Sequence, residues 1–249
     1  MVQALVARAA GEPLEVTDVE LRSVEPGDVR VRVAGVGVCH SDLSMVNGTL
    51  RPSYPLVLGH EASGVVTEVG EQVSGIALGD HVVLNWAVPC RTCWHCTHGE
   101  PWLCSTIEGM TGTPGGLLDD GTPFDACLGL GAMAEEVVVR ANAVIPIPNE
   151  VPLQDAALLG CAVLTGVGAA TNAAGVESGE SVAVVGLGGV GLSAVMGARL
   201  AGAGQVIAVD TSASKEPLAR SLGATDFLVA GDDVHKRVRA LTEIGRAHV

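Results

Sequence analysis

The sequence predicts an α/β protein whose first half is mostly β and whose second half is a parallel sheet flanked by helices. In the first half, short Val-rich runs such as residues 29–33 and 64–69 alternate with a period of two and are broken by Gly, Pro and Asp, which is typical of half-buried strands. After Pro146 and Pro148 the composition shifts to Ala, Gly, Leu and Val. There, strands alternate with helices, as in βα units.

The length of the chain indicates two domains. It has 249 residues, of which 48% are hydrophobic, enough for a sizeable core but more than one domain usually contains. We place the first domain at residues 1–150 and the second at 151–249. Within the second we expect parallel strands at 182–185, 205–209 and 226–229, and helices at 190–201, 214–222 and 233–241.

The charge of the chain argues against some classes of partner. A net charge of -14 and a pI near 4.8 do not suit a nucleic acid, whose binding requires Lys and Arg to neutralise phosphates. Glu12, Glu15 and Asp18 interrupt the first twenty residues before an export signal can form. Glycines also interrupt the long uncharged stretches, so we expect no membrane span. These features predict an acidic cytoplasmic protein.

Four of the seven cysteines form a compact pattern. Because no export signal is visible, metal ligation or catalysis is expected in preference to disulfides. Cys90, Cys93, Cys96 and Cys104 have the spacing C-x2-C-x2-C-x7-C, and four thiolates can surround one zinc ion tetrahedrally at about 2.3 Å. With no open position such a zinc would be structural. A reduced, unligated loop and an iron–sulfur site are the alternatives.

Two further segments resemble the zinc-containing medium-chain alcohol dehydrogenase family. Cys39 is followed by a segment, residues 59–73, that reads G-H-E-x2-G-x5-G-x2-V and contains His60 and Glu61. This string is similar to the zinc signature of that family. Cys161, together with Thr165 and the glycine after it, matches the family's third-ligand segment.

The chemistry favours the same three ligands. Two thiolates and one imidazole, from Cys39, Cys161 and His60, leave one position of a zinc ion open for water or an alcohol oxygen. An ion with an open position acts as a Lewis acid. Taken alone, each of these residues is more simply interpreted as a packed core residue.

The family resemblance implies roles for the neighbouring residues. Asp42 would orient His60, and Glu61 would be an acidic neighbour of the metal. Ser41 would begin the proton relay, although Ser44 stands where one branch of the family has the His that ends it. His40 would contact a coenzyme phosphate, or would simply be a partly exposed His.

A glycine-rich string in the second half predicts a dinucleotide site. It has the form G-x-G-x-x-G and lies between an expected strand and an expected helix, where it can bring a pyrophosphate to the helix N-terminus. A purely structural turn is the alternative. The string consists of Gly186, Leu187, Gly188, Gly189, Val190 and Gly191.

Two charged residues follow at the end of the next strand. Asp210 lies 19 residues beyond Gly191, where a carboxylate can bind the adenosine ribose and favour NAD over NADP. Lys215 resembles a family residue that contacts the same ribose, although a solvated Lys is an alternative reading. Thr165 is a further expected coenzyme contact.

The resemblance implies a fold and sets an expectation about the C-terminal end. It implies a GroES-like β-barrel catalytic domain followed by a Rossmann-type doubly wound sheet, of which only the first half is present. The tail after Thr242 is expected to be unnatural, because residues 244–249 match a translation of the sequencing-adapter read ATC GGA AGA GCA CAC GTC.

The function implied is zinc-dependent hydride transfer between a small alcohol and NAD, giving an aldehyde or ketone, with one catalytic and one structural zinc. A thiol-adduct formaldehyde dehydrogenase is an alternative within this class. A truncated, non-catalytic zinc-binding fragment is an alternative from a different class. The full-length protein is expected to be a homodimer or homotetramer.

Overall fold

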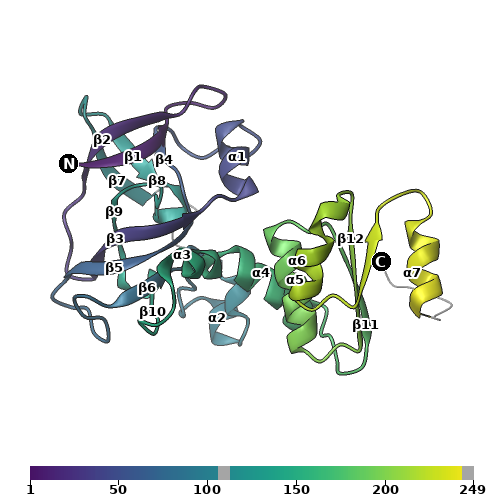
Figure 1. Ribbon diagram of the computed structural model, residues 1–249. Coiled ribbons are helices and arrows are strands. Elements are labelled where there is room, and N and C mark those ends of the chain that lie inside the picture. The colour runs from purple at the N-terminus through teal and green to yellow at the C-terminus, as the bar shows by residue number, and fades with distance from the viewer. Residues whose placement is uncertain (106–112, 243–249) are drawn as a thin grey trace. The chain divides into compact units, whose positions relative to one another are not determined.

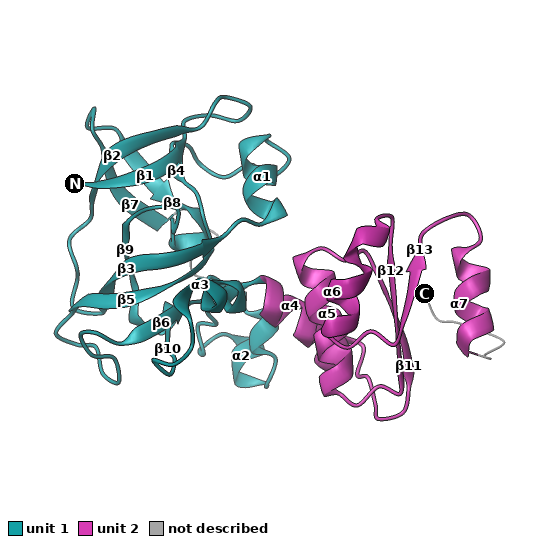
Figure 2. Ribbon diagram, in the orientation of Figure 1, with its two compact units in different colours: residues 1–161 teal, residues 162–249 magenta. Residues whose placement is uncertain are grey.

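The computed structural model describes residues 1–105 and 113–242 and divides into two compact units, residues 1–161 and 162–249 (Figure 2). The expected tail anomaly at residues 244–249 lies outside the described residues. Within the described chain, no single helix is long and apolar enough to cross a membrane; only a bent pair, Leu153–Gly160 with Ala162–Ala173, passes that test of length and composition.

The first unit is built from β-strands, as the period-two runs predicted (Figure 1). Five strands close into a barrel in the order β1-β2-β7-β8-β4, and five others form a sheet in the order β10-β6-β5-β3-β9. The pairing is antiparallel except between β4 and β8. The barrel strands are β1 (Val2–Ala7), β2 (Glu15–Leu21), β4 (Leu56–Val57), β7 (Thr113–Leu118) and β8 (Pro123–Ala126). The sheet strands are β3 (Asp28–Gly37), β5 (Glu61–Val69), β6 (His81–Leu84), β9 (Glu136–Arg140) and β10 (Val144–Pro146).

Short helices join these strands and carry much of the site described below. The α-helices of the first unit are α1 (His40–Val46), α2 (Trp94–Thr97) and α3 (Leu153–Ala156). Its 3-10 turns are η1 (Pro101–Leu103), η2 (Cys127–Gly129), η3 (Ala141–Ala143) and η4 (Ala157–Gly160).

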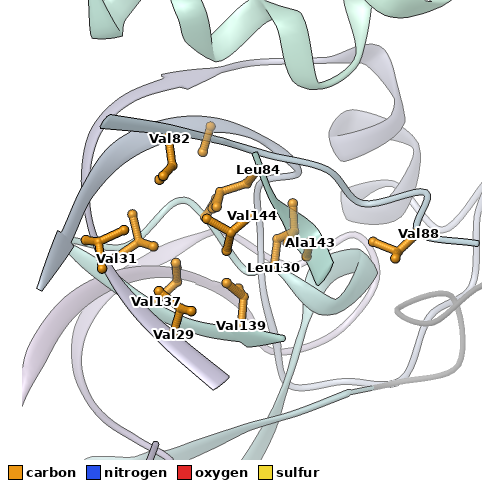
Figure 3. Packing of buried hydrophobic residues seen from close by; sticks show 13 residues of the cluster. Val29, Val31, Val82, Leu84, Val88, Leu130, Val137, Val139, Ala143 and Val144 are labelled. Atoms are coloured by element: carbon orange, nitrogen blue, oxygen red, sulfur yellow. The ribbon is translucent and has the colours of Figure 1, made fainter. Parts of the chain in front are cut away.

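The main core of the first unit lies against the five-stranded sheet (Figure 3). Valines at alternate positions of β3 and β9 point into it, and Val82 and Leu84 of β6 enter from a neighbouring strand. A separate cluster that includes Val6, Val19 and Phe124 belongs to the barrel strands. Burial of alternate side chains therefore fixes the register of each strand.

The second unit has three parallel strands in the order β11-β12-β13. Helices α5 and α6 lie on one face of this sheet and α7 on the other (Figure 1). The strands are β11 (Ser181–Val185), β12 (Gln205–Asp210) and β13 (Asp226–Val229). The helices are α4 (Ala162–Gly168), α5 (Gly189–Leu200), α6 (Glu216–Ser221) and α7 (Val234–Thr242), with the shorter η5 (Ala169–Ala173) and η6 (Ala213–Lys215). The three βα units of the sequence-based prediction are confirmed.

A matched pair of substitutions on β3 tests this core. Val31 is fully buried, whereas Val36 on the same strand is 42% exposed. We expect Val31→Ala to lower the free energy of unfolding of the first unit by about 1–3 kcal/mol, because it leaves a cavity. Val36→Ala should change it by less than about 0.5 kcal/mol.

The measurement is urea unfolding followed by tryptophan fluorescence. All three tryptophans of the chain lie in the first unit, so the signal reports this unit alone. Equal losses of stability in the two variants would contradict the assignment of Val31 to the core.

Candidate functional site

Four potential metal ligands meet in the first unit although they come from distant parts of its sequence. Cys39 caps the N-terminus of α1, His60 and Glu61 lie where β5 begins, and Cys161 follows η4. One ligand atom of each lies within 4.8 Å of every other. His60 and Glu61 are buried, and the two cysteines are half-buried. The structure therefore brings together the three metal ligands predicted from the sequence, with Glu61 beside them.

The side chain of Asp42 supports this cluster from behind. Its carboxylate accepts hydrogen bonds from the backbone N–H of Cys39 at 3.0 Å and of Gly59 at 3.3 Å, and it lies 3.0 Å from Nδ1 of His60. Because Nδ1 faces Asp42, the other ring nitrogen of His60 remains for the cluster. Burial lowers the pKa of His60, but hydrogen bonds with Asp42, Cys127 and Cys161 more than offset this and raise it.

The absence of a side chain at Gly37 leaves room for the side chain of Glu61. A Cβ atom on Gly37 would lie 2.3 Å from Oε2 of Glu61, so only glycine fits there without displacing the carboxylate. Gly59 has a φ of +97°, a conformation that glycine adopts without strain. Gly37 therefore leaves space for the Glu61 carboxylate, and Gly59 permits the left-handed backbone immediately before His60.

The remaining sequence-predicted residues of this region lie on α1. Oγ of Ser41 is 3.8 Å from Sγ of Cys39, so the hydroxyl lies next to the sulfur of a predicted ligand. His40 is exposed and Ser44 is half-buried.

Two residues near the cluster were missed in the sequence. The buried thiol of Cys127, in the turn η2, lies within 4.8 Å of ligand atoms of His60 and Asp42. The ring of Trp86 meets that of His60 edge-on, with centroids 6.2 Å apart. A seventh, unassigned cysteine was the only signal for Cys127, and no spacing pattern singled out Trp86.

The four-cysteine loop forms a second cluster. The sulfur atoms of its cysteines all lie within 4.8 Å of one another. Backbone N–H groups of Cys96 and Ser105 hold the pKa of Cys93 at about 5, whereas burial raises the pKa of Cys96 to about 12. The loop thus stabilises thiolate at one position through backbone donors, as a metal-binding loop does. Its members are Cys90, Cys93, Cys96 and Cys104.

The glycine-rich string lies in the second unit between β11 and α5, as predicted. Gly186 has a φ of +88°, Gly188 caps the N-terminus of α5, and α5 begins at Gly189. A Cβ on Gly191 would lie 1.8 Å from the carbonyl oxygen of Gly186, and one on Gly166 would lie 2.3 Å from that of Val190. The string therefore needs glycine for close packing within its own unit. It also leaves exposed backbone at the start of a helix.

Asp210 and Lys215 lie beside this string. Oδ2 of Asp210 accepts hydrogen bonds from the backbone N–H of Leu187 at 2.7 Å and from Nζ of Lys215 at 2.8 Å, and Oδ1 accepts one from the N–H of Ser212. Lys215 and these backbone donors lower the pKa of Asp210. Thr165, on α4, is exposed.

Two glycines of the string provide a matched test of its packing. We expect Gly191→Ala to destabilise the second unit by about 1–3 kcal/mol, because the new methyl group would overlap the Gly186 carbonyl. Gly188→Ala should have a much smaller effect, since its φ is -79° and a Cβ there would meet nothing within 4 Å. Thermal unfolding followed by far-UV circular dichroism measures both, and a Gly191→Ala variant as stable as the parent would contradict this geometry.

Comparisons with known proteins find related domains for both units of the chain. The model of the alcohol dehydrogenase GroES-like domain matches residues 25–149, and that of the zinc-binding dehydrogenase domain matches residues 189–249. The chain is 38% identical over 247 residues to an NDMA-dependent alcohol dehydrogenase of Amycolatopsis methanolica, with 96% of this chain and 66% of that protein covered. It is 41% identical over 235 residues to a probable S-(hydroxymethyl)glutathione dehydrogenase of Schizosaccharomyces pombe, with 91% and 62% covered. The chain thus spans slightly less than two thirds of the length of these relatives.

Solved structures give the same result. The crystal structure of an alcohol dehydrogenase zinc-binding domain protein from Burkholderia ambifaria matches with a TM-score of 0.92 and 38% identity, covering 98% of this chain and 68% of that one. Benzyl alcohol dehydrogenase from Acinetobacter calcoaceticus matches with a TM-score of 0.88 and 31% identity, with the same coverage. The fold is a GroES-like domain followed by Rossmann-type βα units, in agreement with the matched domains. The chain belongs to the zinc-containing medium-chain alcohol dehydrogenase family.

Proposed function

We propose that this protein transfers a hydride between an alcohol and NAD, giving an aldehyde or a ketone, with the help of a catalytic zinc ion. The observation that carries the proposal is the meeting of Cys39, His60 and Cys161 within 4.8 Å, in a cluster separate from the four-cysteine loop. Two thiolates and one imidazole are the ligand set of a catalytic zinc with an open position.

The residues around the cluster suit this ion. Zinc supplies a Lewis acid that stabilises negative charge on a bound oxygen. Asp42 holds His60 in the tautomer that ligates a metal, because its carboxylate faces Nδ1. Glu61 places a further carboxylate beside the ligands. The Ser41 hydroxyl, next to the Cys39 sulfur, accepts the proton of the alcohol and passes it on toward solvent.

The four-cysteine loop is proposed to hold a structural zinc. Four sulfur ligands within 4.8 Å of one another can fill all positions of a tetrahedral ion and leave none for substrate. Such a site contributes to folding free energy.

The second unit is proposed to bind the adenosine half of NAD. The exposed glycine string would receive the pyrophosphate at the start of α5. Asp210 would accept hydrogen bonds from the ribose hydroxyls and repel a 2′-phosphate. Lys215, already paired with Asp210 at 2.8 Å, would contact the same ribose. His40 would meet a coenzyme phosphate.

A second candidate is oxidation of a thiol adduct of formaldehyde. The observation that favours it is the 40–41% identity to proteins named S-(hydroxymethyl)glutathione dehydrogenase, from Schizosaccharomyces pombe and Escherichia coli. Ser44, in place of a His that would end the proton relay, is compatible with this substrate class.

Metal content tests the two-site assignment. We expect two zinc ions per chain in protein produced with zinc available. Cys90→Ser should lose one zinc and stability together, whereas Cys39→Ser should lose the other with a smaller loss of stability. Elemental analysis with thermal unfolding measures both, and one zinc per chain in the parent protein would contradict the assignment.

Turnover tests the reaction itself. We expect NADH to form on addition of an alcohol, and the rate to fall to background in Cys39→Ser, which lacks a catalytic ligand. Rates with formaldehyde are compared with and without glutathione, and NDMA is added as an alternative acceptor. A large stimulation by glutathione would favour the second candidate. Equal background rates in the parent chain and Cys39→Ser would favour a non-catalytic zinc-binding protein.

Coenzyme preference tests the role of Asp210. In the full-length protein, we expect Asp210→Ala to lower the ratio of kcat/KM for NAD to that for NADP by at least about tenfold, through loss of ribose hydrogen bonds and relief of repulsion. Asp226→Ala, which also removes a carboxylate at one end of a strand of the same sheet, is the control and should leave the ratio unchanged. An unchanged ratio in Asp210→Ala would mean that another group discriminates.

A further inference from the structure

The first unit contains a small pocket that neither cysteine cluster occupies. It is formed by the end of β9, the turns η2 and η3, and the residues that follow β2 and β6. Its volume is about 30 Å³, roughly two to three times what one water molecule needs. Its lining includes four residues with polar side chains that can donate hydrogen bonds: Arg22, Asn85, Arg140 and Asn142. The pocket therefore has the size and the donors for a small anion.

A single buried carboxylate is paired with both arginines. Asp28 is fully buried, and its Oδ2 is bound by Nη1 of Arg22 and by the backbone N–H of Glu25 at 3.1 Å. Its Oδ1 has no hydrogen-bond partner among the described residues. Nε of Arg140 lies 3.7 Å from this oxygen, which is beyond hydrogen-bond distance. Two guanidinium groups thus share one buried negative charge.

The pair of arginines therefore carries more positive charge than its buried partner can match. Glu25 also approaches Arg140, at 3.9 Å, but both side chains of this pair are more than half exposed, and water weakens such a pair. Arg30 differs, since it lies 3.1 Å from Glu68 and 3.2 Å from Glu136. An excess of positive charge thus lines this pocket in a chain whose net charge is -14.

Two amide side chains add neutral donors to the lining. Oδ1 of Asn85 accepts a hydrogen bond from the backbone N–H of Ala87 at 3.0 Å, which fixes the orientation of the amide and leaves its NH2 group as a donor. Asn142, in the turn η3, is exposed, so its amide is accessible. Charged and neutral donors together suit an oxyanion.

Apolar side chains complete the lining. They belong to Trp86, Val88, Leu128 and Leu130. Leu128 has a φ of +48°, a left-handed conformation that is uncommon for a residue other than glycine and that recurs at ligand-binding sites. Such walls suit the carbon end of a small organic anion, because an oxygen atom placed against them would lose its hydrogen bonds to water.

We propose that this pocket binds a small carboxylate, of the size of formate or acetate. The planar fork of a guanidinium group matches the two oxygens of a carboxylate, and the carbon end faces Trp86 and the leucines. The excess positive charge matches a monoanion, whereas a phosphate group gains a second negative charge near neutrality and has oxygen on every side. The site and its test do not depend on the proposed hydride transfer.

Trp86 makes occupation of the pocket measurable. It lines the pocket and is half-buried, whereas Trp94 and Trp102 are 63% and 72% exposed. A ligand in the pocket displaces water from beside the Trp86 ring and so changes its emission. Because Trp94 and Trp102 lie in or beside the four-cysteine loop, their emission should be unaffected.

The proposal is tested by titrating the full-length protein with sodium formate or sodium acetate in place of sodium chloride, at constant ionic strength. We expect a saturable change in tryptophan emission and a matching rise in Tm, because a ligand that binds only the folded state stabilises it. The upper limit of binding energy per non-hydrogen atom restricts formate to a Kd of about 0.5 mM or weaker. Sodium phosphate is titrated in parallel.

Variants locate the response. Asn85→Asp keeps the oxygen that accepts from Ala87 and replaces the NH2 group by a negative oxygen, so the affinity for formate should fall at least about tenfold. Arg140→Met removes the excess charge from a side chain that is 57% exposed, and a similar loss is expected. Arg30→Met removes an arginine outside the pocket and is the matched control, with unchanged affinity.

Three results would overturn the proposal. The first is the lack of a saturable response to formate and acetate in the folded parent protein. The second is a response of unchanged affinity in both Asn85→Asp and Arg140→Met, since the anion would then bind elsewhere. The third is phosphate that binds as tightly as formate and is equally sensitive to Arg140→Met, since the pocket would then not select a carboxylate.

Discussion

The hydrogen bonding of the Asp42 carboxylate is the interaction on which the arrangement of Cys39 and His60 depends. Asp42 is 3% exposed, and its carboxylate binds the N–H of Cys39, the N–H of Gly59 and Nδ1 of His60. One buried group thus ties the first turn of α1 to the segment that leads into β5. A buried carboxylate is costly unless its hydrogen bonds are made, so these three contacts stabilise one another. The carboxylate thus holds Cys39 and His60, which come from two distant segments, side by side.

Both units also use glycine where the backbone comes close to a polar atom. Gly37 leaves room for the Glu61 carboxylate, and in the other unit Gly191 leaves room for the Gly186 carbonyl. In both places a methyl group would occupy space that belongs to a polar atom. In each unit, the lack of a side chain at glycine therefore allows the polar atom to occupy its position.

The sequence predicted the repeating parts of the structure well, for a physical reason. The alternation in residues 29–33 and the glycine string before α5 are local patterns that reflect local geometry. The four-cysteine loop is equally local. By contrast, Cys39, His60 and Cys161 are far apart in the chain, so family resemblance was needed to unite them. The position of Cys127 behind His60 depends on how η2 packs against α1 and β5, and periodicity carries no information about such packing.

Under the proposed function, the hydrogen bonds of Asp210 have a consequence for how coenzyme selectivity responds to pH. Lys215 and the backbone N–H groups of Ser212 and Leu187 lower its pKa below that of an ordinary carboxyl. The group is therefore already ionised in mildly acidic solution and remains so as the pH rises. A 2′-phosphate, by contrast, gains charge near neutrality, because its second pKa is about 6. The proposed repulsion between the two groups would therefore exist already in mildly acidic solution, where the phosphate carries one negative charge, and would grow as the phosphate gains its second. Rejection of the phosphorylated coenzyme would then be strongest in alkaline solution.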